Sequence, residues 1–356
     1  MEVTTLLKLL VQKQGSDLFF SAGARPHVKV QGVHLPVGAE SLTGDEIRDM
    51  AYSLLDDRQI QEFEKTWEFN LGLSLDGIGR FRINIFRQRG EPAMVIRHVK
   101  DKVPSVEELN LPPILKQLVM EPRGLILVVG ATGSGKSTTL AAMIEHRNQS
   151  QPGHILTIED PIEFSHRHRR SIINQRELGL DTHSYSAALQ NAMREAPDVI
   201  LIGEIRDRAS MQHAIAYAET GHLCLSTLHA SNANQTLDRI VNFFPDSAHR
   251  QIYTDLSLNL KAVISQRLIS ACSGGLIPAV EVMLLSSYVS KLIRKGEISG
   301  IKEIMEQSDI RGMQTFDQAL YTLYQKGRIT LEEALQHADS RNDLSLRIRL
   351  DAAAGE

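Results

Sequence analysis

The chain has 356 residues, more than the ~100–200 of one ordinary domain, so its length predicts two or three domains. Hydrophobic residues make up 42% and charged residues 23%, which is typical of a folded protein and excludes a disordered or collagen-like chain. Lys and Arg total 39 against 43 Asp and Glu, and the formal charge of −4 argues against a protein that binds nucleic acid along a broad basic surface.

The cysteine count and the length of the apolar runs indicate the cellular compartment that we expect for the protein. Cys224 and Cys272 are too few for a four-cysteine zinc site or a disulfide framework and favour a reducing environment. No apolar run reaches the ~18 residues that span a bilayer, and the first residues lack the pattern of a signal peptide. We therefore expect a cytoplasmic protein with no segment inserted in a membrane, so that any role at a membrane requires a partner.

Residues 1–99 are predicted to form a small mixed α and β domain. An apolar stripe indicates a helix near the N-terminus, and Thr43 with Glu46 forms a capping box at the start of a second helix, expected over residues 44–64. Alternating apolar residues predict strands in three places: a hairpin over 26–36, and strands over 78–86 and 93–99.

The pattern changes after a proline-rich stretch that we interpret as a linker over residues 100–112. Residues 113–273 alternate apolar runs with helical patterns, which favours a parallel sheet wrapped by helices and hence an α/β core. The expected strands are 124–129, 154–158, 199–202 and 223–227, and the expected helices are 114–120, 140–148, 185–195 and 210–219. Residues 274–356 are predicted to be mostly helical.

A glycine-rich segment after the first core strand fits the phosphate-binding pattern G-x-x-x-x-G-K-[ST]. Its backbone N–H groups, together with the N-terminus of the following helix, suit phosphate oxygens. Lys136 is expected to reach the β- and γ-phosphates and the Ser137 hydroxyl to ligate Mg²⁺. The predicted nucleotide-binding residues are Gly130, Ala131, Thr132, Gly133, Ser134, Gly135, Lys136, Ser137 and Thr138. Because no Asn/Thr-Lys-x-Asp motif for guanine is present, we expect ATP.

Carboxylates follow two other predicted strands. Glu204 comes after the strand at 199–202, where it can hold Mg²⁺ through water, although an ordinary carboxylate at a strand end is the alternative. The turn from Glu159 to Glu163 contains Pro161, which separates the two glutamates. We assign Glu163 as the general base for water and give Glu159 a supporting role, for Glu163 or for Mg²⁺; a solvated acidic turn is the alternative.

Histidines and arginines complete the candidate site. His222 and His229 flank the strand at 223–228 and are interpreted as contacts to the γ-phosphate or to a neighbouring subunit, the alternative being packing or capping. Arg80 and Arg82 share one strand face, and Arg97 lies on the next predicted strand. They suit arginine fingers that complete a site in trans, although a solvated basic face or a nucleic-acid groove would use the same residues.

These motifs, in this order, resemble the secretion-type ATPases, and most closely the type IV pilus retraction branch of PilT and PilU. The similarity lies in the phosphate loop, Glu159-Asp160-Pro161-Ile162-Glu163, Gly203-Glu204-Ile205-Arg206-Asp207, and Thr220-Gly221-His222 with His229. Further similar segments are Gly15-Ser16-Asp17-Leu18, Gly77-Ile78-Gly79-Arg80-Phe81-Arg82 and Ala338-Asp339-Ser340, so that the resemblance covers nearly the whole chain.

The resemblance implies a homo-hexameric ring whose subunits have a PAS-like N-terminal domain, a RecA-like P-loop ATPase domain and a helical C-terminal extension. It implies ATP and Mg²⁺ as ligands, Glu163, Glu204, His222 and His229 as functional residues, and Arg80, Arg82 and Arg97 as the N-domain arginines. It further implies an inner-membrane platform protein and a PilT-like retraction ATPase as partners, so that the protein is cytoplasmic and peripheral at the inner membrane.

One segment departs from the PilT type, which has an Ala-Ile-Arg-Asn-Leu box tied to retraction. The matching residues here read Tyr288-Val289-Ser290-Lys291-Leu292, which favours the accessory, PilU-like branch. The leading hypothesis is therefore a retraction motor acting alongside a PilT-like partner. The alternatives are a nucleotide-binding regulatory or structural subunit with little turnover, and a nucleic-acid translocase on the same core, which the acidic net charge argues against.

Overall fold

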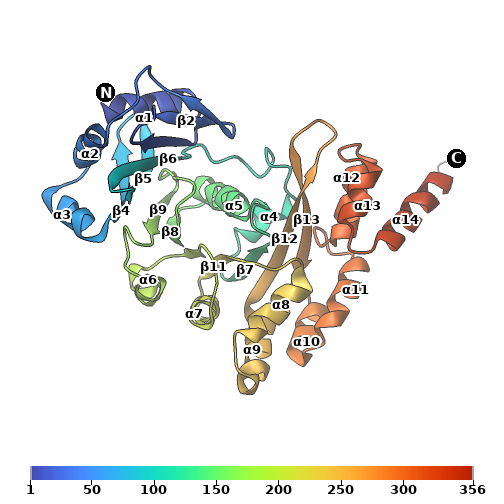
Figure 1. Ribbon diagram of the computed structural model, residues 1–356. Coiled ribbons are helices and arrows are strands. Elements are labelled where there is room, and N and C mark those ends of the chain that lie inside the picture. The colour runs from blue at the N-terminus through green and yellow to red at the C-terminus, as the bar shows by residue number, and fades with distance from the viewer. Residues whose placement is uncertain (1, 355–356) are drawn as a thin grey trace. The chain divides into compact units, whose positions relative to one another are not determined.

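The computed structural model describes residues 2–354, with side chains described up to residue 351, and the chain divides into two compact units (Figure 1). The first unit runs to Lys102 and also includes residues 162–165 and 179–181, whereas the second contains the rest. Residues 103–112 differ from the predicted linker, because Val106 and Leu111 are buried in the core of the second unit. No helix among residues 2–354 has the length and apolar character needed to cross a bilayer.

The first unit is a six-stranded antiparallel sheet in the order β3-β2-β1-β6-β5-β4, covered by helices. Its core contains the apolar face of α1 and one face of β5, where Phe81, Ile83 and Ile85 are buried. The elements are α1 (Val3–Gln12), β1 (Asp17–Ser21), β2 (His27–Val30), β3 (Val33–Pro36), α2 (Gly44–Tyr52), α3 (Asp57–Thr66), β4 (Glu68–Leu75), β5 (Gly79–Gln88) and β6 (Glu91–Val99).

The hairpin and the capping box of Thr43 with Glu46 are confirmed, but the single helix predicted over 44–64 is wrong. The chain forms two helices, because Asp56 leaves the helical conformation and makes a second capping box with Gln59 at the start of α3. A local sequence signal therefore existed for this break.

The second unit is built on a seven-stranded sheet in the order β13-β12-β7-β11-β10-β8-β9. All neighbouring strands are parallel except β12 and β13. The elements are α4 (Ile114–Leu118), β7 (Gly124–Val129), α5 (Lys136–Ser150), β8 (Gly153–Glu159), β9 (Ser171–Glu177), α6 (Tyr185–Ala192), β10 (Val199–Ile202), α7 (Arg208–Glu219), β11 (Leu223–Leu228), α8 (Ala233–Asn242), α9 (Asp246–Asn259), β12 (Leu260–Ser270), β13 (Leu276–Leu284), α10 (Ser287–Lys295), α11 (Ile301–Glu306), α12 (Phe316–Gln325), α13 (Leu331–His337) and α14 (Arg341–Ala354).

Both faces of this sheet are covered, which explains why β7, β10 and β11 are buried along their whole length and why β7 and β10 are continuously apolar. Alternate residues of β7 face opposite sides: Ile126 and Val128 pack with α4 and α5, whereas Leu125 and Leu127 pack with the layer of α6 to α9 (Figure 1). The predicted α/β class is therefore confirmed.

The region predicted to be helical from residue 274 begins later, because β13 is a strand of the core sheet. β12 pairs with β7, and β13 pairs antiparallel with β12 through the register Ser265–Glu281. Helices prevail only from Ser287 onward. The sequence reasoning missed both strands, since a buried apolar segment between helices does not itself distinguish strand from helix.

Candidate nucleotide and ATPase site

The parallel register places several loops at one edge of the sheet. The last residue of β7 pairs with the last residue of β11, and Ile202 at the end of β10 pairs with Ser226 of β11 and with Ile158 of β8. The loops after these strands therefore meet, although they are far apart in the sequence. Ligands bind at the carboxyl ends of strands in sheets of this kind.

The phosphate loop connects β7 to the 15-residue helix α5, as the sequence predicted. Gly130, Gly133 and Gly135 have φ values of 153°, 79° and 88°, a region that residues with a Cβ rarely adopt. A Cβ on Gly130 would also lie 2.4 Å from the Ser134 Oγ. The glycines are thus required by the backbone path itself.

The polar groups of this loop suit a phosphate. The Lys136 Nζ donates to the carbonyl oxygens of Gly130 and Ala131 at 3.0 and 2.9 Å, so the lysine folds back along the loop. The buried Ser134 Oγ has no hydrogen-bond partner among the described residues, and Ser137 is exposed in the first turn of α5. A helix N-terminus with a lysine and free hydroxyls fits a phosphate chain and its Mg²⁺.

Gln266 on β12 supports the loop from behind and was not found from the sequence. Its amide oxygen accepts from the Thr139 hydroxyl at 2.7 Å, and both residues are buried. Its backbone oxygen and its amide nitrogen lie so close to the loop that a Cβ on Gly130 or Gly135 would come within 2.5 or 2.8 Å of them. No local signal indicated this residue, since its partner is 127 positions away.

Glu204 lies at the carboxyl end of β10, as predicted, and two cationic or polar side chains hold its carboxylate. The His229 Nε2 lies 2.9 Å from its Oε1, and the Arg206 Nε donates to its Oε2 at 2.9 Å. The Thr227 hydroxyl donates to the carbonyl of Gly203 at 2.7 Å and fixes the preceding residue. The arrangement orients Glu204 and leaves it beside the end of β11.

Glu159 ends β8 at the same edge. Its Oε1 accepts from the Thr157 hydroxyl at 2.6 Å and from the Gln175 amide at 3.2 Å. The neighbouring Tyr185 is half-buried near Asp160, and its partial burial together with that carboxylate raises the pKa of its hydroxyl, which therefore stays protonated at neutral pH. The Thr157 hydroxyl and the Gln175 amide thus orient the Glu159 carboxylate at this edge.

Glu163 belongs to the short segment 162–165 of the first unit. It is exposed between the buried residues Ile162 and Phe164, and the Ser165 N–H donates to the Lys100 carbonyl at 2.8 Å. The side chain of Glu163 is thus presented by a strand-like segment anchored on both sides. Its assignment as the general base stays a prediction.

His222 and His229 lie at opposite ends of β11. The Gly124 N–H donates to the His222 carbonyl at 3.0 Å, so His222 is at the edge where β7 begins, away from the phosphate loop. Its Nδ1 lies 3.1 Å from the Thr220 hydroxyl. Of the two histidines, only His229 is brought to Glu204, and the functional role predicted for His222 stays a prediction.

The three predicted arginines share one face of the first unit's sheet. Arg82 pairs directly with Arg97 in the register of β5 and β6, and Arg80 is two residues from Arg82. The Arg97 Nε donates to Asp17 at 2.7 Å, and Arg80 lies 3.9 Å from Asp181. The alternation that the sequence suggested is confirmed, and the function of the arginines stays a prediction.

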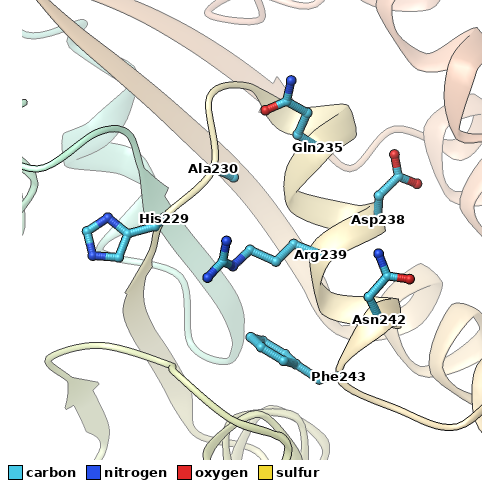
Figure 2. A pocket seen from close by; sticks show the side chains of 7 residues that line it. All are labelled: His229, Ala230, Gln235, Asp238, Arg239, Asn242 and Phe243. Carbon is cyan, nitrogen blue, oxygen red and sulfur yellow. The ribbon is translucent and has the colours of Figure 1, made fainter.

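A groove of about 460 Å³ opens beside His229 (Figure 2). Arg239 extends from α8 toward the histidine, and the apolar end of the groove is formed by Phe243. The remaining lining residues are Ala230, Gln235, Asp238 and Asn242. The edge that contains Glu204 is therefore accessible next to the start of α8.

Comparisons with known proteins agree with this geometry. The family model "Type II/IV secretion system protein" matches residues 68–345. The chain is 52% identical to the "Type IV pilus ATPase PilU" of Pseudomonas aeruginosa over 98% of this chain and 92% of that protein. It is 40% identical to the "Type IV pilus retractation ATPase PilT" of the same organism, over 95% of this chain and 98% of that one.

A solved structure of the pilus retraction motor PilT with bound ADP is similar along almost its entire length. The TM-score is 0.89 at 38% identity, and the alignment covers 97% of this chain and 99% of the other. The Legionella pneumophila ATPase DotB, with a TM-score of 0.79 at 22% identity, shares the fold. The α/β fold with an antiparallel N-terminal sheet, a largely parallel second sheet and C-terminal helices is thus common to them.

Proposed function

The chain belongs to the type II/IV secretion system family and, within it, to the type IV pilus ATPases, and on this premise we propose an ATP-hydrolysing motor that drives or assists pilus retraction and twitching motility. The observation that carries the proposal is one sheet edge that combines the phosphate loop with Glu204 and His229. The ADP bound to the related PilT supports a nucleotide at this loop.

The residues of the chain have separable tasks in hydrolysis. Lys136 leaves the loop carbonyls and binds the β- and γ-phosphates, while the N–H groups at the start of α5 bind their oxygens. Ser137 and, through water, Glu204 would hold Mg²⁺, which would neutralise phosphate charge. Glu163 takes the proton of the attacking water. His229 and Arg206 keep Glu204 oriented beside the phosphates.

The assembly we propose is a homo-hexameric ring. Arg80, Arg82 and Arg97 lie together on one face and would supply positive charge to a γ-phosphate in a neighbouring subunit. His222, at the other sheet edge from His229, would contact a neighbouring subunit as well. The ring would work in the cytoplasm at the inner membrane, with a pilus platform protein and a PilT-like ATPase as partners.

A second candidate is a nucleotide-binding regulatory subunit with little turnover of its own. It is favoured by α10, whose segment Tyr288–Leu292 differs from the Ala-Ile-Arg-Asn-Leu box, and in which Tyr288 is 72% exposed. The higher identity to PilU than to PilT agrees with an accessory position. Both candidates bind ATP at the same loop, so turnover distinguishes them.

Hydrolysis of Mg-ATP by the purified chain, measured across protein concentration, tests the proposal. A specific rate that rises with concentration and disappears in Lys136→Ala is expected, because the site is completed between subunits. Lys65→Ala, at an exposed lysine of α3, is the matched control and should retain the wild-type rate. A rate no higher than that of Lys136→Ala at every concentration, with ATP still bound, would instead favour the regulatory subunit.

A further inference from the structure

Glu281 is a buried carboxylate in the middle of β13, and the chemistry described above does not use it. It is 3% exposed and lies in a strand whose other central residues are apolar. Removing a carboxylate from water is costly unless hydrogen bonds replace the lost hydration. Such a residue in a sheet core therefore needs hydrogen-bond donors from neighbouring elements.

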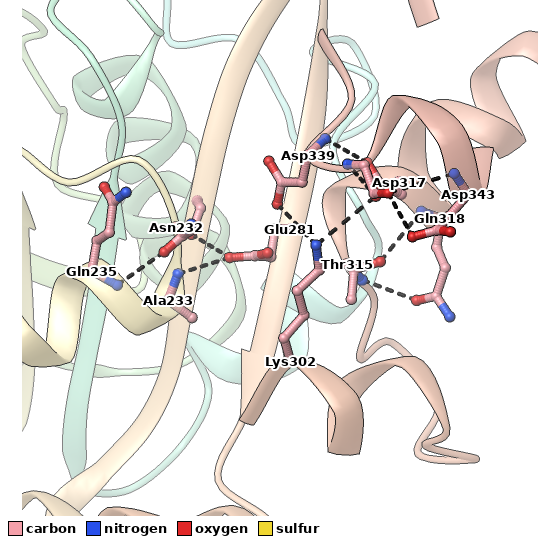
Figure 3. Close-up of polar contacts among 12 residues, drawn as sticks. Asn232, Ala233, Gln235, Glu281, Lys302, Thr315, Asp317, Gln318, Asp339 and Asp343 are labelled. Atoms are coloured by element: carbon pink, nitrogen blue, oxygen red, sulfur yellow. Dashed lines mark hydrogen bonds and ion pairs between the residues drawn. The ribbon is translucent and has the colours of Figure 1, made fainter. Parts of the chain in front are cut away.

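The carboxylate joins β13 to two other elements (Figure 3). Its Oε1 accepts from the backbone N–H of Ala233 at 2.8 Å and from the Ser265 hydroxyl at 3.0 Å. Ala233 is the first residue of α8, and Ser265 lies directly opposite Glu281 on β12. One oxygen atom thus links the start of a helix to the sheet.

The first turn of α8 is held from two sides. The Asn232 side chain caps it locally by accepting from the Gln235 N–H at 2.9 Å. Glu281 accepts from the first N–H of the helix, which has no partner inside the helix. The local cap stabilises the helix itself, whereas the hydrogen bonds of Glu281 link its start to β12.

Both ends of this link lead to the ATPase site. His229 is four residues before Ala233 and contacts Glu204. On the other side, Ser265 is adjacent to Gln266, which supports the phosphate loop from behind. Glu281 therefore connects the strand behind the phosphate loop with the segment that carries His229.

We propose that Glu281 is a positioning residue of the ATPase site, which anchors the start of α8 on β12 and so keeps His229 in contact with Glu204. The inference rests on the proposed function of this site. In this proposal, Glu281 acts on the site through the segment 229–233 and not through a contact with the nucleotide.

Two substitutions of Glu281 leave side chains that differ in how strongly they accept a hydrogen bond. Glu281→Leu keeps most of the volume and removes the acceptor, whereas Glu281→Gln keeps an amide oxygen that accepts more weakly than a carboxylate. In hydrogen exchange of the full-length protein at about pH 8, the amide of Ala233 should exchange about fivefold faster in Glu281→Gln and faster still in Glu281→Leu. The rate kcat at saturating ATP should fall in the same order, by roughly tenfold in Glu281→Leu, with KM for ATP changed less.

Asp317→Leu is the matched control, because Asp317 also accepts from two backbone N–H groups, those of Asp339 and Ser340 (Figure 3). It lies on α12 and, among the described residues, forms no hydrogen bond or ion pair with α8. We expect the control to leave both exchange in residues 229–236 and kcat unchanged, even if it lowers the melting temperature.

Wild-type exchange at residues 229–236 in both Glu281 variants would overturn the proposal, as would unchanged kcat in an otherwise active enzyme. If Glu281→Leu does not fold, Glu281→Gln alone decides through the exchange rate of Ala233. If the wild type shows no turnover above Lys136→Ala, the proposed function fails instead. Exchange then still decides on Glu281, because it does not depend on hydrolysis.

Discussion

Burial of Glu281 predicts a stability that depends on pH. Burial raises the pKa of its carboxyl from 4.5 to about 7, and Asp339 nearby acts in the same direction. The hydrogen bonds from Ala233 and Ser265 and the charge of Arg267 act against it. The folded protein therefore holds a proton between pH 4.5 and 7 that the unfolded chain has released.

The sign and the size follow from this difference. A raised pKa in the folded state contributes stability that is complete below pH 4.5 and is lost as the pH rises through about 7. The full difference corresponds to about 3 kcal/mol of unfolding free energy, of which about 2 kcal/mol is gained between pH 8 and pH 5.5. Glu281→Gln removes this gain, because an amide does not titrate.

Urea unfolding of the wild type and Glu281→Gln at the two pH values measures this quantity. Far-UV circular dichroism is the suitable signal, since the single tryptophan, Trp67, lies in the first unit. Relative to the variant, the wild type should be more stable at pH 5.5 than at pH 8 by about 2 kcal/mol. Glu332→Gln, at an exposed carboxylate of α13, controls for the loss of one surface charge.

A raised pKa of Glu281 is excluded if the difference in unfolding free energy between wild type and Glu281→Gln is the same at both pH values. It is equally excluded if the wild type loses stability relative to the variant on acidification, because that would mean that the folded state favours the ionised carboxylate. The contributions that titratable groups present in both proteins make to the unfolding free energy cancel in this comparison.

Three further predictions concern the nucleotide site. Glu163→Gln should bind ATP normally and lose turnover, and hydrolysis at the wild-type rate would show that another group is the base. Arg82→Ala should leave ATP affinity of the isolated subunit intact and slow the assembled ring, so equal rates of the two rings would exclude a role in trans. Thr139→Val should lower the unfolding free energy by about 1–3 kcal/mol in urea titrations, because the buried Gln266 oxygen loses its donor; no loss would mean that water replaces the hydroxyl.

The sequence predicted what depends on local backbone geometry. The phosphate loop was predicted because Gly130–Ser137 fits the pattern G-x-x-x-x-G-K-[ST] between an expected strand and an expected helix, and the positive φ values of its glycines explain why the pattern requires them. Glu204 was found because it follows a short apolar run. The break before α3 was missed although its capping box, Asp56 with Gln59, is equally local.

Gln266 and Glu281 could not be predicted in this way. Gln266 bonds to a residue 127 positions away, and Glu281 to one 48 positions away. Both lie on strands that were themselves missed, so no face or neighbour could be assigned to them. A polar residue within an apolar run indicates that a partner exists, but the pairing of β12 with β7 and β13 decides which one.

The length of β11 also places at opposite ends of the strand the two histidines that were predicted to belong to one site. His222 precedes and His229 follows a strand of six residues, which places them about 20 Å apart along the strand. A nucleotide bound at the phosphate loop lies at the edge where β7 and β11 end, so within one chain it can contact only the histidine at that edge. We therefore propose that His229 acts through Glu204 of its own chain and that any functional role of His222 involves a neighbouring subunit.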